Sequence, residues 1–308
     1  MGALNVDIIV RAPATVDGAD ADSESRVDAA RMQELLCAVA SLPRRVTLGG
    51  SAFNTVTGIA RVRPDVGLGF VGVAGQAPFS ATQFVEYLTA LGVDVGELHD
   101  TAARAGVCLA VEHAGNRALR IDPGANTSMA DHLDERRAEI VAYLSRFGTV
   151  HVTSFLDDAT PGALLRLIRV LRRNAPGTRI SLDPGDVWCA APTAAVRGLL
   201  AAADVVFLNR REFASVRGHV DPAATHVLVK TPEGVRVRQA GARNWRYVRH
   251  RLLGPDEIHC PTGAGDAFAA GFLAVSADRP DDVHDAVVAG LAVARRHLRG
   301  ETASGGGA

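Results

Sequence analysis

Short apolar runs alternate with amphipathic stretches along most of this 308-residue chain. The runs at 150–153, 179–183 and 205–208 are typical of buried strands, and a segment with helical spacing follows each of the first two. Parallel strands need a crossover helix between them. The alternation therefore predicts an α/β fold, a doubly wound and mostly parallel sheet with helices on both faces. The segments 4–11 and 104–121 depart from this rhythm, and we expect them to form a small separate β sheet.

The same patterns predict individual elements. We expect one helix over 25–42, a helix that begins with Ser51 as its N-cap, a strand over 66–73 and one helix over 131–146. We also expect a loop over 12–22, a hairpin turn at 114–116 and a fraying tail over 300–308.

The basic residues exclude one class of nucleotide site. Lys230 is the only lysine among 33 basic side chains. A P-loop needs a lysine directly after a glycine, but Lys230 follows Val227–Val229. Any phosphate chemistry therefore has to use backbone amides, arginines or a metal. The net charge of −1 gives no basic footprint for a nucleic acid or an acidic membrane.

The cysteines and the apolar segments indicate a compartment. The four cysteines contain no C-x-x-C pair and fit a reducing environment. The first residues lack a signal-peptide pattern, and the longest uncharged stretch, 66–85, contains several glycines and a proline. We therefore expect a cytoplasmic protein with a small-molecule substrate and no membrane or nucleic-acid partner.

The strongest chemical signal is a glycine turn that precedes a long apolar helix, at Cys260–Phe272. Small residues let the backbone approach a ligand, and the free N–H groups of the first helical turn bind anions such as phosphate. Asp266 lies within this turn, where it would repel a phosphate unless it accepted a proton from a nucleophilic hydroxyl. Its alternative role is to stabilise the helix dipole. The residues alone leave both roles open.

This segment resembles the C-terminal signature of the PfkB, or ribokinase-like, carbohydrate kinases. Four more segments are similar to family motifs and occur in the family's order: Gly2–Asp7, Gly49–Asn54, Asp122–Asn126 and Asn209–Glu212. The resemblance implies one ribokinase-like domain over 1–308. Its β lid would comprise about 4–12, 44–48 and 104–121, and its core about 49–103 and 122–300.

The resemblance implies an ATP-dependent kinase that transfers the γ-phosphoryl group to a hydroxyl of an unphosphorylated sugar or sugar-like molecule. Asp266 would be the base, and the amides of Gly263, Ala264 and Gly265 would stabilise the transferred group. Glu212 and Asn209 would organise Mg²⁺ through water. The implied nucleotide-binding residues are Asn209, Glu212, Lys230, Thr231, Gly234, Gly263 and Gly265. The implied substrate-binding residues are Asn5, Asp7, Gly49, Gly50 and Asn54.

Several segments depart from the family pattern. Cys260-Pro261 stands where the family usually has an Asp-Thr pair near a monovalent cation, so potassium dependence is in doubt. The segment 230–234 is shorter than the family's T-x-G-x-x-G nucleotide loop. The opening motif begins at Gly2 and leaves almost no first strand, so either this strand is clipped or the start codon is misplaced.

The sequence leaves the substrate open. A phosphorylated sugar needs a cationic clamp, and no basic cluster lies beside Gly49-Gly50 except Arg44-Arg45, which favours an unphosphorylated acceptor. The long stretch between Asp7 and Gly49 resembles the adenosine-kinase branch and favours a nucleoside kinase. The altered loops leave a third alternative, a non-catalytic sugar-binding regulatory relative. Lids of this family often pair, so a homodimer through the lid is an additional expectation.

Overall fold

The computed structural model describes residues 1–12, 23–113 and 116–301. Its largest sheet has six strands in the order β13-β12-β11-β10-β9-β8. Their bounds are β8 Thr149–Thr153, β9 Arg179–Asp183, β10 Val205–Asn209, β11 His226–Thr231, β12 Gly234–Arg238 and β13 Arg246–Arg249. Strands β8 to β11 are parallel, whereas β12 and β13 run antiparallel to their neighbours. Because β9 and β10 are short and mostly buried, they fit the interior of such a sheet.

Two more parallel strands, β4 (Leu68–Gln76) and β5 (Val93–Arg104), form a separate sheet. The first residues of the chain lie between β4 and β8. The α-amino group of Met1 donates to the carbonyl of His151 over 2.7 Å, and the Thr153 amide donates to the Met1 carbonyl over 3.1 Å. On the other side, a Cβ at Gly72 of β4 would be 3.1 Å from the Gly2 carbonyl oxygen, so these first residues lie against both sheets.

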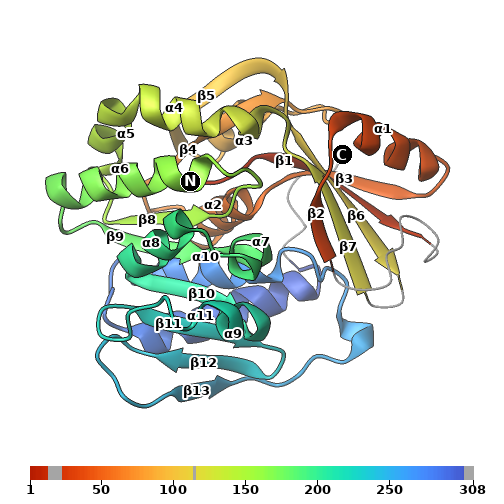
Figure 1. Cartoon of the computed structure of the whole chain (residues 1–308). Helices are drawn as coiled ribbons and strands as arrows, with labels where there is room; N and C mark the ends of the chain where they lie inside the picture. Colours follow the sequence, from red (N-terminus) through yellow and green to blue (C-terminus); the bar gives the residue numbers. More distant parts are fainter. Residues whose placement is uncertain (13–22, 114–115, 302–308) are drawn as a thin grey trace.

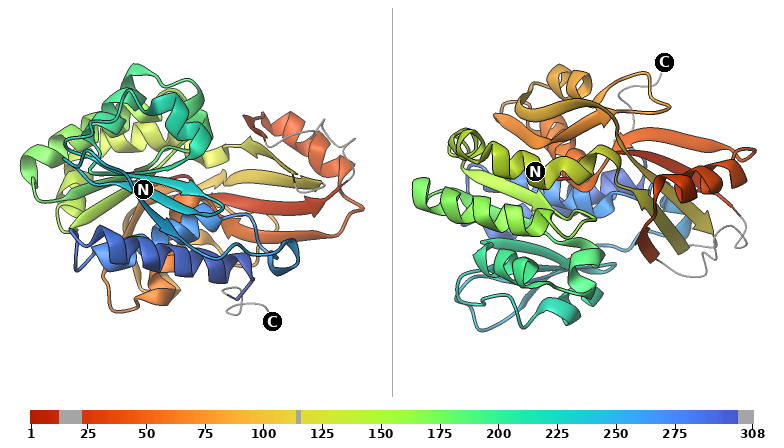
Figure 2. Two further views of the ribbon diagram at one scale, coloured as in Figure 1. Left: turned by 90° about the horizontal axis from the view of Figure 1, so that it is seen from below. Right: turned by 45° about the horizontal axis from the view of Figure 1, so that its top comes forward.

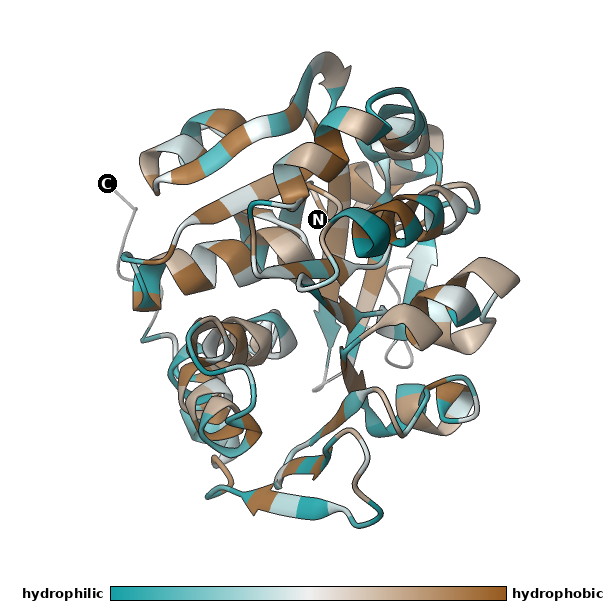
Figure 3. Ribbon diagram, turned by 90° about the vertical axis from the view of Figure 1, so that its left-hand side faces the viewer, coloured by the Kyte–Doolittle hydropathy of each residue, from teal (hydrophilic) through white to brown (hydrophobic). Residues whose placement is uncertain are grey.

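The six-stranded sheet and the β4–β5 sheet form one layer, and helices cover both of its faces (Figure 1). On one face, helices α4 to α9 contact one another in pairs; on the other, α10 packs against α2 and α11. The bounds are α2 Ser51–Val62, α4 Met129–Glu135, α5 Arg137–Leu144, α6 Thr160–Asn174, α7 Gly185–Ala190, α8 Ala194–Ala202, α9 Arg210–Val216, α10 Ala264–Ser276 and α11 Val283–Leu298. In Figure 3 the outer helices alternate between hydrophobic and hydrophilic residues, as expected when one face of a helix is buried. This arrangement confirms the predicted fold class.

Aromatic packing fixes α10 on the sheet. The ring of Phe207 on β10 meets the rings of Phe268 and Phe272 edge to face, with centroids 5.9 and 5.3 Å apart. All three rings are buried. Because α10 begins with the glycine turn, this packing sets where the turn lies relative to the end of β10.

A five-stranded sheet, called the second sheet below, projects from this layer (Figure 2). Its strand order is β2-β7-β6-β1-β3. The bounds are β1 Asn5–Arg11, β2 Ser23–Arg26, β3 Arg44–Gly49, β6 Gly106–His113 and β7 Asn116–Asp122, and α1 (Ala29–Ala38) packs against β6 and β7. At its edge, Arg26 on β2 donates to the carbonyl of Leu156 over 3.1 Å. The action of this sheet as a lid, and the division of the chain into lid and core, stay predictions.

Several predicted elements were wrong. The helix expected over 25–42 is α1 alone, preceded by β2, because the Asp28 carboxylate caps the helix at the Arg31 amide. Ser51 is the first helical residue, and the N-cap is Gly50. The helix expected over 131–146 is interrupted at Arg136, where the backbone leaves helical geometry.

Other elements were not predicted or cannot be described. The twelve-residue strand β5 was missed, because its polar and apolar residues do not alternate regularly and only its first residue, Val93, is buried. The 3₁₀ turns at Gly124–Ser128 and Pro255–Glu257 were also missed. The short helix α3 (Phe84–Ala90), by contrast, lies within the stretch 80–91 whose apolar spacing predicts a helix. The predicted loop, hairpin turn and tail lie mostly outside the described residues. Within the described ranges, no helix is long and apolar enough to cross a membrane.

Candidate active site

Polar side chains gather where the parallel strands end. Asp183 ends β9, Asn209 ends β10 and Lys230 lies near the end of β11. Because these strands are neighbours, their carboxyl ends form one edge of the sheet, which is where α/β folds bind ligands. This edge and the second sheet enclose a cleft of about 1480 Å³. Pockets for one small ligand typically have roughly 300–1,000 Å³, so the cleft has room for two.

The glycine turn presents backbone amides to this cleft. Gly263 is the N-cap of α10 and has a left-handed backbone with φ of 84°. The next residues, Ala264 and Gly265, line the cleft with it. From α11, a ring nitrogen of His297 lies 2.6 Å from the carbonyl oxygen of Thr262 and supports the turn from behind. The turn and the start of α10, whose first N–H groups have no partner within the helix, therefore line the cleft. Their action as an anion hole stays a prediction.

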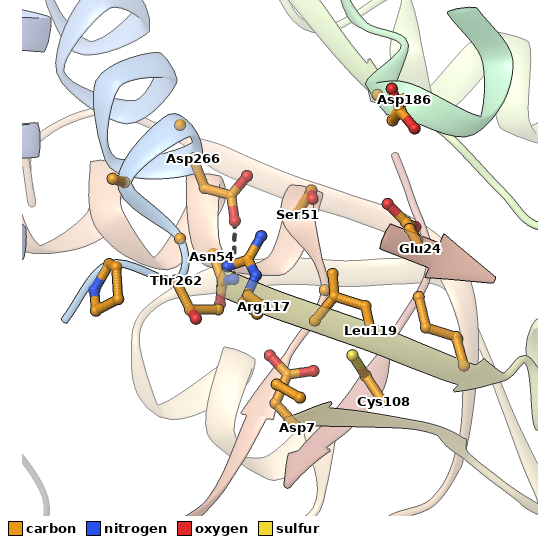
Figure 4. Close-up of a pocket in the computed structure, with 18 of the residues that line it drawn as sticks. Asp7, Glu24, Ser51, Asn54, Cys108, Arg117, Leu119, Asp186, Thr262 and Asp266 are labelled. Carbon is orange, nitrogen blue, oxygen red and sulfur yellow. Dashed lines mark hydrogen bonds between the residues drawn. The ribbon is translucent and has the colours of Figure 1, made fainter. Parts of the chain in front are cut away.

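Asp266 lies in the first turn of α10 and faces the cleft (Figure 4). Its carboxylate accepts a hydrogen bond from the side-chain amide of Asn54 over 2.9 Å. Burial raises the pKa of Asp266 to about 6, opposed by the Asn54 hydrogen bond and assisted by the charge of Asp183. A carboxylate with this pKa is ionised at neutral pH and is a competent proton acceptor.

Asp7 on β1 lies at the other side of the cleft (Figure 4). Burial raises the pKa of Asp7 to about 7, the charge of Asp266 raises it further, and Arg117 and Arg45 oppose both effects. Gly49 leaves the space for this carboxylate, because a Cβ at residue 49 would be 2.0 Å from an Asp7 oxygen. The charges of Asp7 and Asp266 therefore repel each other across the cleft.

Asn5 is held by the side chain of Asn126, and Gly50 by close packing against the backbone of Ala3. The buried amide of Asn126 donates to Asn5 Oδ1 over 3.1 Å and also bonds the backbone of Leu4. Gly50 has φ of 108°, and a Cβ there would be 2.2 Å from the Ala3 carbonyl oxygen. The start of β1 and the start of α2 are thus packed too closely for a side chain at residue 50.

Asn209 and Glu212 form a helix capping box at the start of α9. The Asn209 side chain accepts from the Glu212 amide over 2.8 Å, and the Glu212 carboxylate accepts from the Asn209 amide over 2.7 Å. Burial and the neighbouring Asp183 carboxylate raise the pKa of Glu212. No group of three metal-ligating side chains occurs in the part of the chain that the structure describes. Glu212 and Asp183 are two neighbouring carboxylates, and such a pair suits a Mg²⁺ ion that keeps most of its water.

The predicted nucleotide-loop residues separate into two sets. Lys230 lines the cleft, and its ammonium donates to Asp183 over 2.8 Å. Thr231 instead donates to the carbonyl of Gly234 over 3.0 Å within the turn between β11 and β12. Gly234 packs against β13, where a Cβ would be 2.2 Å from the Val248 carbonyl oxygen. Neither Thr231 nor Gly234 is among the residues that line the cleft.

Sequence reasoning missed four residues of this cleft or its support: Ser51, Arg117, Asp183 and His297. Asp183 follows a buried strand just as Asn209 does, so its position at a strand end was a usable signal. Arg117 comes from β7 and reaches the cleft near Asp7 (Figure 4). The sequence gives no local signal for Arg117 or His297, since their positions depend on tertiary packing.

Comparisons with known proteins agree with this geometry. The family model of the pfkB family carbohydrate kinases matches residues 40–300. An ATP-dependent ribose-1-phosphate kinase from Halopiger xanaduensis is 30% identical over 238 residues, which are 75% of this chain and 74% of that protein.

Solved structures show the same fold. Adenosine kinase from Schistosoma mansoni in complex with 2-fluoroadenosine superposes with a TM-score of 0.82 and 17% identity, over 97% of this chain and 94% of that one. A probable sugar kinase from Rhizobium etli has a TM-score of 0.74 and 22% identity, over 97% and 91% of the two chains. Taken with the match of the family model, the chain belongs to the pfkB family of carbohydrate kinases and is a phosphotransferase that uses an alcohol group as acceptor.

Proposed function

We propose that this enzyme transfers the γ-phosphoryl group of ATP to a hydroxyl of an unphosphorylated sugar or sugar-like small molecule, with Asp266 as the base. The observation that carries the proposal is the position of the Asp266 carboxylate. It lies beside the amides of Gly263, Ala264 and Gly265 and faces the cleft. A proton acceptor next to an anion hole is what attack of a hydroxyl on a phosphate requires.

In the proposed reaction, Asp266 takes the proton of the acceptor hydroxyl as its oxygen attacks the γ-phosphorus. The bond from this phosphorus to the bridging oxygen breaks, and ADP leaves with that electron pair. The amides of residues 263–265 stabilise charge on the phosphoryl oxygens during transfer, when it is delocalised over them. Asn54 holds the base through its hydrogen bond.

The acceptor would lie between Asp266 and the wall formed by β1 and the start of α2. Asn5 and Asp7 lie on β1, and Asn54 begins the second turn of α2. Their amide and carboxylate groups give directional donors and acceptors for sugar hydroxyls. Gly49 and Gly50 let the backbone approach closely, which supports their assignment to the substrate wall.

Asn209 and Glu212 would hold Mg²⁺ through water at the phosphate side of the cleft. When bound there, the ion would neutralise phosphate charge and orient the nucleotide. Lys230 and Pro232 of the 230–234 segment line the cleft, and Lys230 is the one we assign to the nucleotide side. Potassium dependence, dimer formation through the second sheet and a cytoplasmic location stay predictions.

Two observations favour specific rival acceptors. Leu119, Ile121 and Phe155 line the cleft and would suit the base of a nucleoside. Arg117 and Arg45 lie near Asp7. Arg45 belongs to the Arg44-Arg45 pair close to Gly49 in the sequence, and the fold adds Arg117 from β7. Together with the ribose-1-phosphate kinase relative, these arginines make a phosphorylated sugar a reasonable candidate.

The test measures ADP release and phosphorylated product with ATP and Mg²⁺ for ribose, ribose 1-phosphate and adenosine. Our proposal expects the highest kcat/KM for the neutral sugar class. A preference for adenosine or for ribose 1-phosphate replaces the acceptor class but keeps the kinase assignment. Binding of an acceptor with no transfer to any of them would leave the regulatory alternative and would contradict the proposal.

A further inference from the structure

The only lysine of the chain lies at the centre of the acidic part of the cleft. Lys230 Nζ is 2.8 Å from Asp183 Oδ2, and the two side chains are only 21% and 14% exposed. The ammonium also lies against the glycine turn, since a Cβ at residue 265 would be 3.3 Å from Nζ. A strand end and the anion hole therefore meet at this one group.

The charges around Lys230 explain why it stays protonated in a mostly buried position. Burial lowers its pKa, but the carboxylates of Asp183, Glu212 and Asp266 together raise it above the ordinary value. These same carboxylates would repel an incoming triphosphate. The charges of all three carboxylates act on the Lys230 ammonium, so this cation offsets their repulsion where phosphate has to approach.

We propose that Lys230 is a catalytic residue, whose ammonium donates hydrogen bonds to the phosphoryl group during its transfer, from a position beside the amides of residues 263–265. Asp183 is the positioning residue that holds this ammonium. An ammonium has three N–H donors, and Asp183 accepts one of them in this structure. The inference rests on the proposed function, because it assumes that a phosphoryl group occupies the anion hole.

Lys230 takes no part in the proton transfer. The acceptor oxygen forms the new bond to phosphorus, the bond to the ADP oxygen breaks, and Asp266 receives the proton. The ammonium remains charged throughout and stabilises the negative charge on the phosphoryl oxygens. This role also explains Gly265: any side chain at residue 265 would press on the ammonium.

The first experiment compares two variants that each remove a partly buried ion pair. Lys230→Met removes the pair with Asp183. Arg172→Met removes the pair with Asp204, in which a guanidinium nitrogen lies 2.6 Å from a carboxylate oxygen. This pair lies at the amino-terminal end of the same sheet, and its side chains are 30% and 28% exposed. We expect Lys230→Met to lower kcat by ~10²–10³-fold, as for loss of one preorganised donor, with a much smaller change in the acceptor KM. Arg172→Met should keep kcat while it lowers the unfolding temperature.

The second experiment uses the wild-type protein, so it is decisive even if Lys230→Met does not fold. Labelling with ε-¹³C lysine gives one lysine signal, because the chain has a single lysine. We expect this signal to shift on addition of Mg²⁺ and adenylyl imidodiphosphate, which carries the phosphates, and to stay unchanged on addition of adenosine. The Asp183→Asn variant should show a broader or displaced signal before any ligand is added.

The outcomes separate the two proposals. If the wild-type protein phosphorylates no acceptor, the proposed function fails. If it does phosphorylate one and Lys230→Met keeps wild-type kcat, the catalytic role of Lys230 fails while the proposed function stands. An unchanged lysine signal at saturating adenylyl imidodiphosphate, with binding verified by calorimetry, also overturns the role of Lys230.

Discussion

Asn54 and Asp266 are separated by 212 positions in the chain, yet the amide of one donates to the carboxylate of the other over 2.9 Å. The contact depends on close packing of α2 against α10, since a Cβ at Gly58 would be 2.8 Å from the Cβ of Ala270. Helix α2, which carries Asn54 of the substrate wall, therefore also orients the base Asp266. Any acceptor bound by Asn54 is positioned next to Asp266 by the same packing.

The first prediction concerns the base itself. Asp266→Asn keeps the size of the side chain but cannot accept the hydroxyl proton. We expect kcat to fall by ~10²–10⁴-fold, the usual contribution of a general base. Steady-state kinetics with ATP and the best acceptor provide the measurement. Wild-type turnover in this variant would show that Asp266 serves the helix dipole alone.

Asp285→Asn is the matched control for that variant. Asp285 lies in the first turn of α11, as Asp266 lies in the first turn of α10, but its side chain is 54% exposed and pairs with Arg279. It should keep full turnover and lose at most a small dipole contribution to stability, ~0.3–1 kcal/mol. A comparable loss of activity in both variants would point to a general effect on helix stability.

The second prediction is the pH dependence of kcat/KM. Asp266, with its pKa raised to about 6, must be ionised to accept a proton. Activity should therefore be full well above pH 6 and fall about tenfold for each pH unit below it. Asp7 titrates in the same range and interacts with Asp266, so the observed value belongs to the pair. A profile that is flat between pH 5 and 8 would contradict this.

Asn54 provides a way to assign that pH profile. Its amide stabilises the charged form of Asp266, so Asn54→Ala should raise the pKa of the base. A hydrogen bond to a charged group contributes ~1.5–3 kcal/mol, which corresponds to a shift of the acidic limb by about one pH unit or more. The limb should move to higher pH, and KM for the acceptor should rise. An unmoved limb would assign the titration to a different group.

The sequence predicted the parts of this site that are local in the chain. The glycine turn and Asp266 were readable because helix-start chemistry involves consecutive residues. The ion pair of Lys230 with Asp183 was not readable, since it joins residues 47 positions apart on β11 and β9, with β10 between them. Likewise β2 could not be predicted, because four mostly polar residues become a strand only by pairing with β7. Both features depend on which strands are neighbours in a sheet, and a single sequence does not specify that order.

The fourth prediction concerns the close approach of Gly49 to Asp7. A Cβ at residue 49 would be 2.0 Å from an Asp7 oxygen, so Gly49→Ala must displace that carboxylate. We expect a loss of acceptor affinity, visible as a KM increased by about tenfold or more for ~1.4 kcal/mol of lost interaction. Gly67→Ala is the control, since a Cβ there meets nothing within 4 Å. If both variants bind the acceptor as the wild type does, the assignment of Asp7 to the substrate wall is wrong.

The last prediction relates function to stability at Asp7. Its pKa rises from 3.8 to about 7 in the folded protein, because burial disfavours the charged form. Well below its ordinary pKa of 3.8 the carboxyl is protonated in both states and contributes no difference, whereas at pH 8 its ionisation destabilises the fold. Asp7→Asn should therefore raise the free energy of unfolding by ~1–3 kcal/mol at pH 8 and by only a small fraction of this at pH 4. Urea unfolding at both pH values, with the exposed Asp131→Asn variant as control, tests this. The more stable Asp7→Asn variant should nevertheless bind the acceptor worse, because the strained carboxylate is retained for its hydrogen bonds to substrate. A variant that lost stability at pH 8 would mean that ionised Asp7 has a partner in the fold whose stabilisation exceeds the cost of its burial.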